Sequence, residues 1–154
     1  ALGIPLGGRG LSVVGVDFAE AAVAEARARA ASLPADVTSR LEFHIGDAMR
    51  PSSLGLTPGA IVDSGFLHLL DSDERDIFAL DLAKALPPVG RYYLLEFAVT
   101  FDIPNSPAQV TEDELRALFS NERGWRMMAC RPAEFQSRIQ PVPAIAACME
   151  RTAP

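Results

Sequence analysis

The sequence contains little cysteine and little histidine. Two cysteines, Cys130 and Cys148, and two histidines occur among its 154 residues. The cysteines are far apart and lack a Cys-x-x-Cys or histidine-rich context, so we expect buried, reduced thiols rather than a disulfide or a ligand set. No cluster of carboxylates and histidines stands at metal-ligand spacing, so we expect no metal.

Long apolar runs and long basic runs are also missing. No stretch approaches the roughly 18 apolar residues of a membrane span, and no charged-then-apolar leader opens the chain. The formal net charge of -6 argues against a protein that binds phosphate backbones. We therefore expect a cytoplasmic protein whose partners are neither nucleic acid nor membrane. With 49% hydrophobic and 22% charged residues, the composition fits one globular domain over residues 1–154.

Strand-like and helix-like segments alternate along most of the chain. Strands are expected at Val13–Val16, Leu41–Ile45, Ala60–Val62 and Tyr92–Phe97, and helices at Ala19–Leu33, at Ser72–Leu86 with Ser72 as N-cap, and from a Thr111/Glu114 capping box to about Asn121. Two further strands, Trp125–Cys130 and Ala144–Arg151, have no clear helix between them and predict an antiparallel hairpin. The pattern predicts an open, mostly parallel α/β sheet that ends in this hairpin.

Acidic residues follow three successive predicted strands. Asp17 ends the first strand and precedes a helix, a position where a carboxylate can accept hydrogen bonds from both ribose hydroxyls. Asp47 and Asp63 follow the next two strands. Each acid also has a purely structural interpretation: a helix cap for Asp17, a turn former for Asp47 and, on equal terms with a ligand contact, a structural hydrogen-bonding acid for Asp63. Together they indicate one nucleotide-shaped ligand.

Four segments in order, VVGVDF, FHIGDA, IVDSGFLH and LPPVGRYYLLEF, resemble the class I S-adenosylmethionine-dependent methyltransferases. Within that superfamily the chain most resembles small-molecule enzymes of the thiopurine-methyltransferase kind. The resemblance runs from about Leu11 to the C-terminus and includes the terminal hairpin. It implies a Rossmann-like fold, S-adenosylmethionine as cofactor, and methyl transfer to an oxygen, nitrogen or sulfur atom of a small-molecule acceptor.

The resemblance also implies roles for individual residues in cofactor binding. Asp17 would hold the ribose hydroxyls and Phe18 would lie against the adenine. Asp47 would accept a hydrogen bond from the adenine amino group, and Ala48 would supply a backbone contact. These four residues are the predicted adenosine-binding set.

A second set of residues is implied for the reacting end of the site. Ser64 and Gly65 would line the cofactor near its methyl group, and His68 would face the acceptor. A general base is needed where the acceptor must lose a proton, and histidine is the side chain that most often serves in this role, which makes His68 the candidate. A histidine among apolar neighbours is also typical of a core residue. Glu96, an acid inside an apolar strand, could orient an acceptor.

The chain departs from the family in its glycine-rich loop, which precedes the ribose acid by roughly 20 residues. Counting back from Asp17 passes the first residue, and Gly7–Gly10 has no apolar strand before it, so we interpret it as a turn. We therefore expect the family's first strand and loop to be absent, which would leave unpaired sheet edges. This keeps a non-catalytic methyltransferase-like domain that has lost cofactor binding as an alternative.

A short-chain nicotinamide-dependent dehydrogenase is a weaker alternative. Those enzymes carry a Tyr-x-x-x-Lys pair, whereas Tyr92 and Tyr93 are followed four residues later by Glu96 and Phe97.

Overall fold

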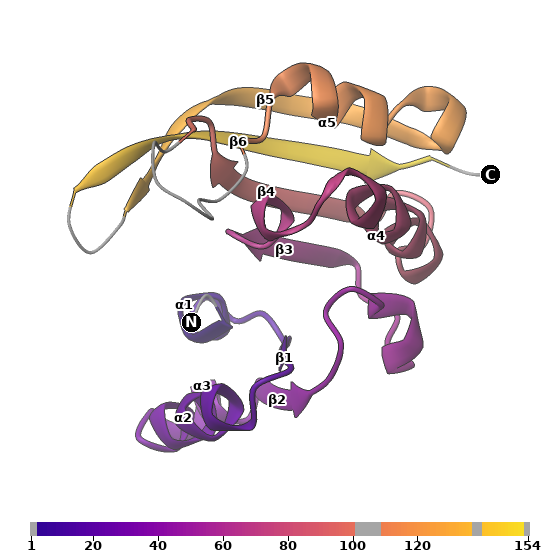
Figure 1. Cartoon of the computed structure of the whole chain (residues 1–154). Helices are drawn as coiled ribbons and strands as arrows, with labels where there is room; N and C mark the ends of the chain where they lie inside the picture. Colours follow the sequence, from indigo (N-terminus) through magenta and orange to yellow (C-terminus); the bar gives the residue numbers. More distant parts are fainter. Residues whose placement is uncertain (1–2, 101–108, 137–139, 153–154) are drawn as a thin grey trace. The chain divides into compact units, whose positions relative to one another are not determined.

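The computed structural model describes residues 3–100, 109–136 and 140–152. The chain divides into two compact units, residues 1–49 and 50–154, whose helices and strands are labelled in Figure 1. Much of the predicted irregular stretch Ala98–Val110 lies outside the described residues. Among the described residues, no helix is both long and apolar enough to cross a membrane.

The first unit is a small α/β unit. Its elements are α1 (Gly3–Gly7), β1 (Val13–Asp17), α2 (Glu20–Ala31), α3 (Ala35–Thr38) and β2 (Leu41–Ile45). Strands β1 and β2 are parallel, with Val13 opposite Leu41 and Asp17 opposite Ile45. The predicted turn is found at residues 8–10, but Gly7 belongs to the short helix α1.

The second unit holds a four-stranded mixed sheet. Its strands are β3 (Ala60–Ser64), β4 (Arg91–Phe97), β5 (Trp125–Gln136) and β6 (Pro141–Arg151), in the order β3-β4-β6-β5. Strand β3 is parallel to β4, and the other two pairs are antiparallel. The predicted α/β fold with a C-terminal hairpin is confirmed. Both hairpin strands extend beyond the ends predicted from the sequence.

Helices and short 3-10 segments connect these strands. They are η1 (Pro51–Leu54), η2 (Leu67–Leu69), α4 (Ser72–Ala85), α5 (Glu112–Leu118) and η3 (Asn121–Arg123). The predicted N-cap of α4 is wrong by one residue: Asp71, not Ser72, caps the helix, because only Asp71 stands three residues before Glu74 and can form the reciprocal capping box with it. Thr111 caps α5 as predicted, accepting from the Glu114 N–H.

Aromatic residues build the core of the second unit. Phe78 of α4 contacts Tyr92 of β4, with ring centroids 6.1 Å apart. Tyr92 contacts Phe119, which follows α5, at 5.4 Å, and Phe119 contacts Trp125 at 5.3 Å. Tyr92, Phe119 and Trp125 are almost completely buried. This packing fixes α4 and the end of α5 against one face of the sheet.

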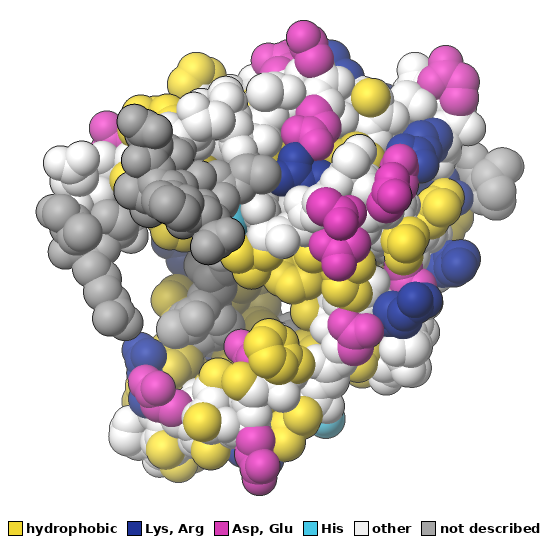
Figure 2. Space-filling model, viewed as in Figure 1, with side chains coloured by type: hydrophobic (Ala, Val, Ile, Leu, Met, Phe, Trp, Pro, Cys, Tyr) yellow, Lys and Arg dark blue, Asp and Glu magenta, His cyan; other side chains and the backbone are white. Residues whose placement is uncertain are grey.

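The charged side chains do not gather by sign on the visible surface. Figure 2 shows acidic and basic groups interspersed over the face in view.

Candidate functional site

The carboxyl end of the two-stranded sheet carries two of the predicted acids. The Gly46 N–H donates to the Asp17 carbonyl oxygen at 3.1 Å, continuing the β1/β2 ladder by one residue. Asp47 follows Gly46 directly. The structure therefore brings Asp17 and Asp47 to the same edge of the first unit, where open α/β sheets bind their ligands.

Both carboxylates also make local hydrogen bonds. Oδ1 of Asp17 accepts from the Ala19 N–H at 2.9 Å, and Oδ1 of Asp47 accepts from the Met49 N–H at 2.9 Å. These bonds occupy one oxygen of each group, and both side chains are exposed. Each acid therefore makes the kind of local hydrogen bond that its structural interpretation requires. The other oxygen of each carboxylate stays available to a ligand.

Phe18 extends the same edge with an uncovered aromatic ring. Its exposed fraction is 83%, which is unusual for phenylalanine. An exposed apolar ring next to the Asp17 carboxylate matches a ligand that combines a sugar with a flat base. The chemistry of these residues therefore fits the adenosine part of S-adenosylmethionine.

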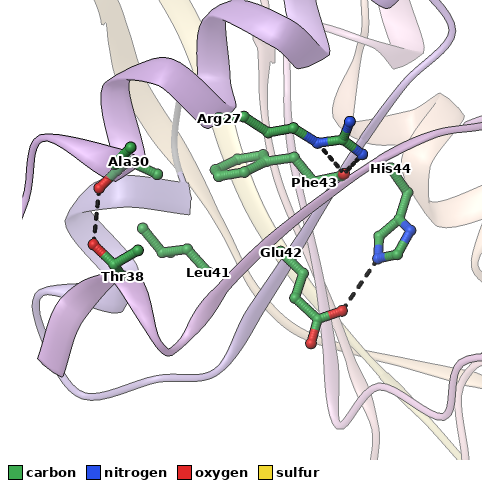
Figure 3. Close-up of a pocket in the computed structure, with 8 residues that line it drawn as sticks. Arg27, Ala30, Thr38, Leu41, Glu42, Phe43 and His44 are labelled. Carbon is green, nitrogen blue, oxygen red and sulfur yellow. Dashed lines mark hydrogen bonds and ion pairs between the residues drawn. The ribbon is translucent and has the colours of Figure 1, made fainter. Parts of the chain in front are cut away.

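A hollow of about 360 Å³ lies elsewhere in the first unit, between α2 and β2. Figure 3 shows Arg27 donating to the Phe43 carbonyl oxygen at 3.1 and 2.5 Å, and the Glu42–His44 pair at 3.2 Å. The lining residues are Arg27, Ala30, Ala31, Thr38, Leu41, Glu42, Phe43 and His44. None of them belongs to the predicted adenosine-binding set. His44 is exposed.

In the second unit, the chain turns sharply after β3. Ser64 ends the strand and is exposed, and the Gly65 N–H donates to the Leu95 carbonyl oxygen at 3.1 Å. Gly65 has φ +81°, and a Cβ there would lie 3.2 Å from Cε1 of His68 and 3.3 Å from the Phe135 ring. Glycine is therefore favoured by both the backbone conformation and the close approach. This turn leads directly into η2, which carries His68.

His68 is held by a buried acid. Its Nδ1 lies 2.7 Å from Oε2 of Glu96 on β4, and its ring lies 4.8 Å from that of Phe97. The exposed fractions of the His68 and Glu96 side chains are 7% and 0%. The sequence singled out both residues but not their pairing. The available signal was Glu96 itself, a charged residue on the face of β4 that also carries Tyr92 and Leu94.

Asp63 has a structural role in this arrangement. It is 8% exposed, and it accepts hydrogen bonds from the N–H groups of Phe66 at 2.9 Å and Leu67 at 3.3 Å and from the Tyr92 hydroxyl at 2.7 Å. The pKa of Asp63 is raised to about 7, mainly by burial and secondly by the negative charge of Glu96. Of the interpretations left open by the sequence, the geometry favours the buried hydrogen-bonding acid.

Arg75 of α4 fixes η2 from the other side. Its Nε donates to the carbonyl oxygens of Leu67 at 3.1 Å and Leu70 at 3.0 Å, and its Nη1 lies 2.5 Å from Oε1 of Glu114 on α5. Arg75 is buried. The sequence carries no signal for this role of Arg75, because an arginine in the first turns of a helix is usually exposed.

Within the described ranges, no group of three or more His, Cys, Asp or Glu residues is placed to hold a metal ion. Cys130 and Cys148 are free thiols and half-buried rather than fully buried. Burial raises the pKa of both thiols, which makes them less reactive than exposed cysteines.

The predicted site residues therefore form two sets, each assembled within its own unit. Asp17, Phe18, Asp47 and Ala48 belong to residues 1–49, and Ser64, Gly65 and His68 belong to residues 50–154.

Solved structures, several of them of methyltransferases, share this fold. A SAM-dependent methyltransferase from Methanosarcina mazei is 20% identical, with a TM-score of 0.77 over 97% of this chain and 86% of that one. The glycopeptide N-methyltransferase MtfA, complexed with S-adenosyl-L-methionine, is 19% identical, with a TM-score of 0.70 over 92% and 74%. A structure from work on the conversion of a disulfide bond into a thioacetal group during echinomycin biosynthesis is 21% identical, with a TM-score of 0.75 over 96% and 69%.

The sequence itself identifies the family. The thiopurine S-methyltransferase (TPMT) family matches residues 4–142, which is most of the chain. The chain therefore belongs to the thiopurine S-methyltransferase family of S-adenosylmethionine-dependent methyltransferases.

Proposed function

We propose that this methyltransferase acts on a small-molecule acceptor with an oxygen, nitrogen or sulfur nucleophile, and that His68 is its general base. The observation that carries this proposal is the buried His68–Glu96 contact of 2.7 Å near the carboxyl ends of β3 and β4. Ligands of open α/β sheets bind at such strand ends. A histidine oriented by a carboxylate is a recurring arrangement for proton removal.

The adenosine-binding set would hold the cofactor. The exposed Asp17 carboxylate would accept from the ribose hydroxyls, and the Phe18 ring would pack against the adenine. Asp47 would accept from the adenine amino group, with Ala48 contributing its backbone. When bound, S-adenosylmethionine supplies a methyl group on a positively charged sulfur. The support for these roles is the family, the common strand edge and the exposure of the groups.

The second unit would position the acceptor and remove its proton. With Nδ1 of His68 engaged by Glu96, Nε2 is the ring nitrogen that would take a proton from the nucleophile. Ser64 and Gly65 would line the reacting end. Holding two reactants in line can lower a barrier by about 7–11 kcal/mol, so orientation is the main contribution expected from the protein.

We also infer a cytoplasmic location, from the sequence expectation of reduced thiols, and partners limited to small molecules. The acidic charge of -6 and the free state of Cys130 and Cys148 support this inference. A pull-down with nucleic acid or anionic vesicles that retained the protein at physiological salt would contradict it.

Isothermal titration with S-adenosylmethionine tests the cofactor roles. We expect saturable binding to the full chain and at least about a tenfold loss of affinity in Asp17→Ala, since the lost hydrogen bonds involve a charged acceptor. Asp36→Ala is the matched control, because Asp36 is an exposed acid of the same unit whose recorded ion pair is with Arg40 on the surface. Absence of binding to the unmodified chain would instead support the non-catalytic alternative.

Methyl transfer tests the role of His68. With a panel of aromatic thiols, amines and phenols and a labelled methyl donor, His68→Gln should reduce turnover by about 100-fold or more while leaving cofactor affinity unchanged. His44→Gln is the control, since His44 lies in the other unit and is exposed. Equal turnover in both variants would remove His68 from the mechanism.

A further inference from the structure

Two acidic side chains are buried next to each other in the second unit. The parallel register places Asp63 of β3 opposite Leu94 of β4, so Glu96 lies two residues further along the neighbouring strand, on the same face. Asp63 is 8% exposed and Glu96 is 0% exposed. Glu96 is, after burial, the next cause that raises the pKa of Asp63.

The same two amides serve both acids. The Phe66 N–H donates to Oδ1 of Asp63 at 2.9 Å and to Oε1 of Glu96 at 3.0 Å. The Leu67 N–H donates to Oδ2 of Asp63 at 3.3 Å and to Oε1 of Glu96 at 2.9 Å. The carboxyl groups therefore converge on one pair of donors.

Two negative charges in this position are costly. Burial disfavours a carboxylate, and a second one alongside adds repulsion. The Arg75 cation does not neutralise the pair, because its recorded hydrogen bonds run to two carbonyl oxygens and to Glu114. A proton bound to one carboxyl group would remove one of the two negative charges. Its O–H could then donate a hydrogen bond to an oxygen of the other carboxyl group.

We propose that Asp63 and Glu96 share one proton, carried by Asp63, and that the remaining charge on Glu96 fixes His68 with Nδ1 protonated. Asp63 and Glu96 are then positioning residues that act through His68. The inference rests on the proposed role of His68 as base. The pKa of Asp63, raised to about 7, supports this arrangement.

Within the part of the chain that the structure describes, two titratable groups contact the pair. His68 of η2 contacts Glu96, and the Tyr92 hydroxyl of β4 donates to Asp63. Loss of the Asp63 proton would place a second negative charge beside Glu96, and the environment of His68 should respond at the same pH. A merely structural acid would titrate at an ordinary carboxyl pKa and leave His68 unaffected there.

Nuclear magnetic resonance of the full chain, without cofactor or acceptor, tests this. His44→Gln leaves His68 as the one histidine, so ¹⁵N-labelled imidazole reports its tautomer directly. Carboxyl ¹³C signals of labelled aspartate report Asp63, assigned by their loss in Asp63→Asn. We expect an Nδ1–H tautomer of His68, and an Asp63 midpoint near pH 7 instead of about 4. Asp81→Asn, another buried acid that accepts two hydrogen bonds, should leave both signals in place.

The charge of Glu96 is tested separately. Glu96→Gln should lower the proton affinity of Asp63 by at least about tenfold, whereas Glu150→Gln, a buried acid paired with Arg91 and Arg126, should not change it. An Asp63 midpoint near 4 in the unsubstituted chain would overturn the proposal even if a variant failed to fold. Because no methyl donor is present, failure here is distinct from failure of the methyl-transfer assay.

Discussion

The Tyr92 hydroxyl donates to Oδ2 of Asp63 at 2.7 Å, inside the core of the second unit. Tyr92 is completely buried, and burial together with the Asp63 charge raises the pKa of the phenol well above its usual value. The same ring contacts Phe78 and Phe119. The aromatic core thus positions the acid that accepts from the first amides of η2, and through η2 it positions His68.

Removing this hydroxyl should destabilise the second unit. Tyr92→Phe removes the shorter of the two hydrogen bonds recorded for Oδ2 of the buried Asp63, so we expect a loss of about 1–3 kcal/mol in the free energy of unfolding. Urea unfolding followed by Trp125 fluorescence measures it, since Trp125 is the single tryptophan and lies in the same core. Tyr93→Phe, at a more exposed position, should change the value by less than about 0.5 kcal/mol. Equal effects would mean that the bond contributes nothing.

The raised pKa of Asp63 predicts a pH-dependent stability. The native state binds the Asp63 proton up to about pH 7, whereas the unfolded state releases it near 3.8. Between these values the native state binds more protons than the unfolded state. The contribution of Asp63 to the free energy of unfolding therefore falls as the pH rises, and it stops changing above about pH 7. The total effect is on the order of 2–4 kcal/mol.

Asp63→Asn should flatten this dependence, because an amide imitates the protonated acid at every pH. Unfolding of the variant and of the parent chain at about pH 5 and about pH 8 gives the comparison. Asp81→Asn should keep the slope of the parent chain, since Asp81 hydrogen-bonds to Ser52 and not to Asp63. A slope unchanged by Asp63→Asn would contradict the raised pKa.

Gly65 should be sensitive to a single added methyl group. Gly65→Ala introduces a Cβ at φ +81° that meets His68 and Phe135. Gly55→Ala has the same kind of backbone strain, with φ +67°, but nothing lies within 4 Å of the added Cβ. We expect about 1 kcal/mol of destabilisation at Gly55 and clearly more at Gly65. The difference between the two variants isolates the contact with the site, and equal losses would show that the contact is absent.

The local elements could be predicted because their signals are local. The β-branched run at Val13–Val16 and the alanine-rich segment after it specify a strand and a helix without any partner, and the structure places them within two residues of the predicted ends. The strand-end position of Asp17 and Asp47 followed from the same pattern. The short segments α3 and η1 were missed because four residues are too few to show a period.

The His68–Glu96 pair could not be predicted from the sequence in the same way. The two residues are separated by 28 positions, and their contact depends on the register between β3 and β4, which no single strand specifies. The hairpin was predicted too short because of its prolines. Pro132 is tolerated because β5 is the edge strand of its sheet, and Pro143 lies beyond the last residue that β6 pairs with β4.

Arg75 offers a test of how η2 is held that does not involve the acids. Arg75→Met keeps most of the buried aliphatic volume but removes the donors to the Leu67 and Leu70 carbonyl oxygens and to Glu114. We expect a loss of about 2–4 kcal/mol in the free energy of unfolding, because two carbonyl oxygens next to η2 and the Glu114 carboxylate lose a charged donor.

The matched control is Arg116→Met, which breaks an exposed pair with Glu112 one turn away on α5. Such pairs contribute about 0.5 kcal/mol or less. The ¹⁵N signals of His68 provide a second readout: they should broaden or shift in Arg75→Met and stay unchanged in Arg116→Met. If both variants unfold like the parent chain and leave His68 undisturbed, η2 is held by the Asp63 and Glu96 acceptors alone, and Arg75 does not position the proposed base.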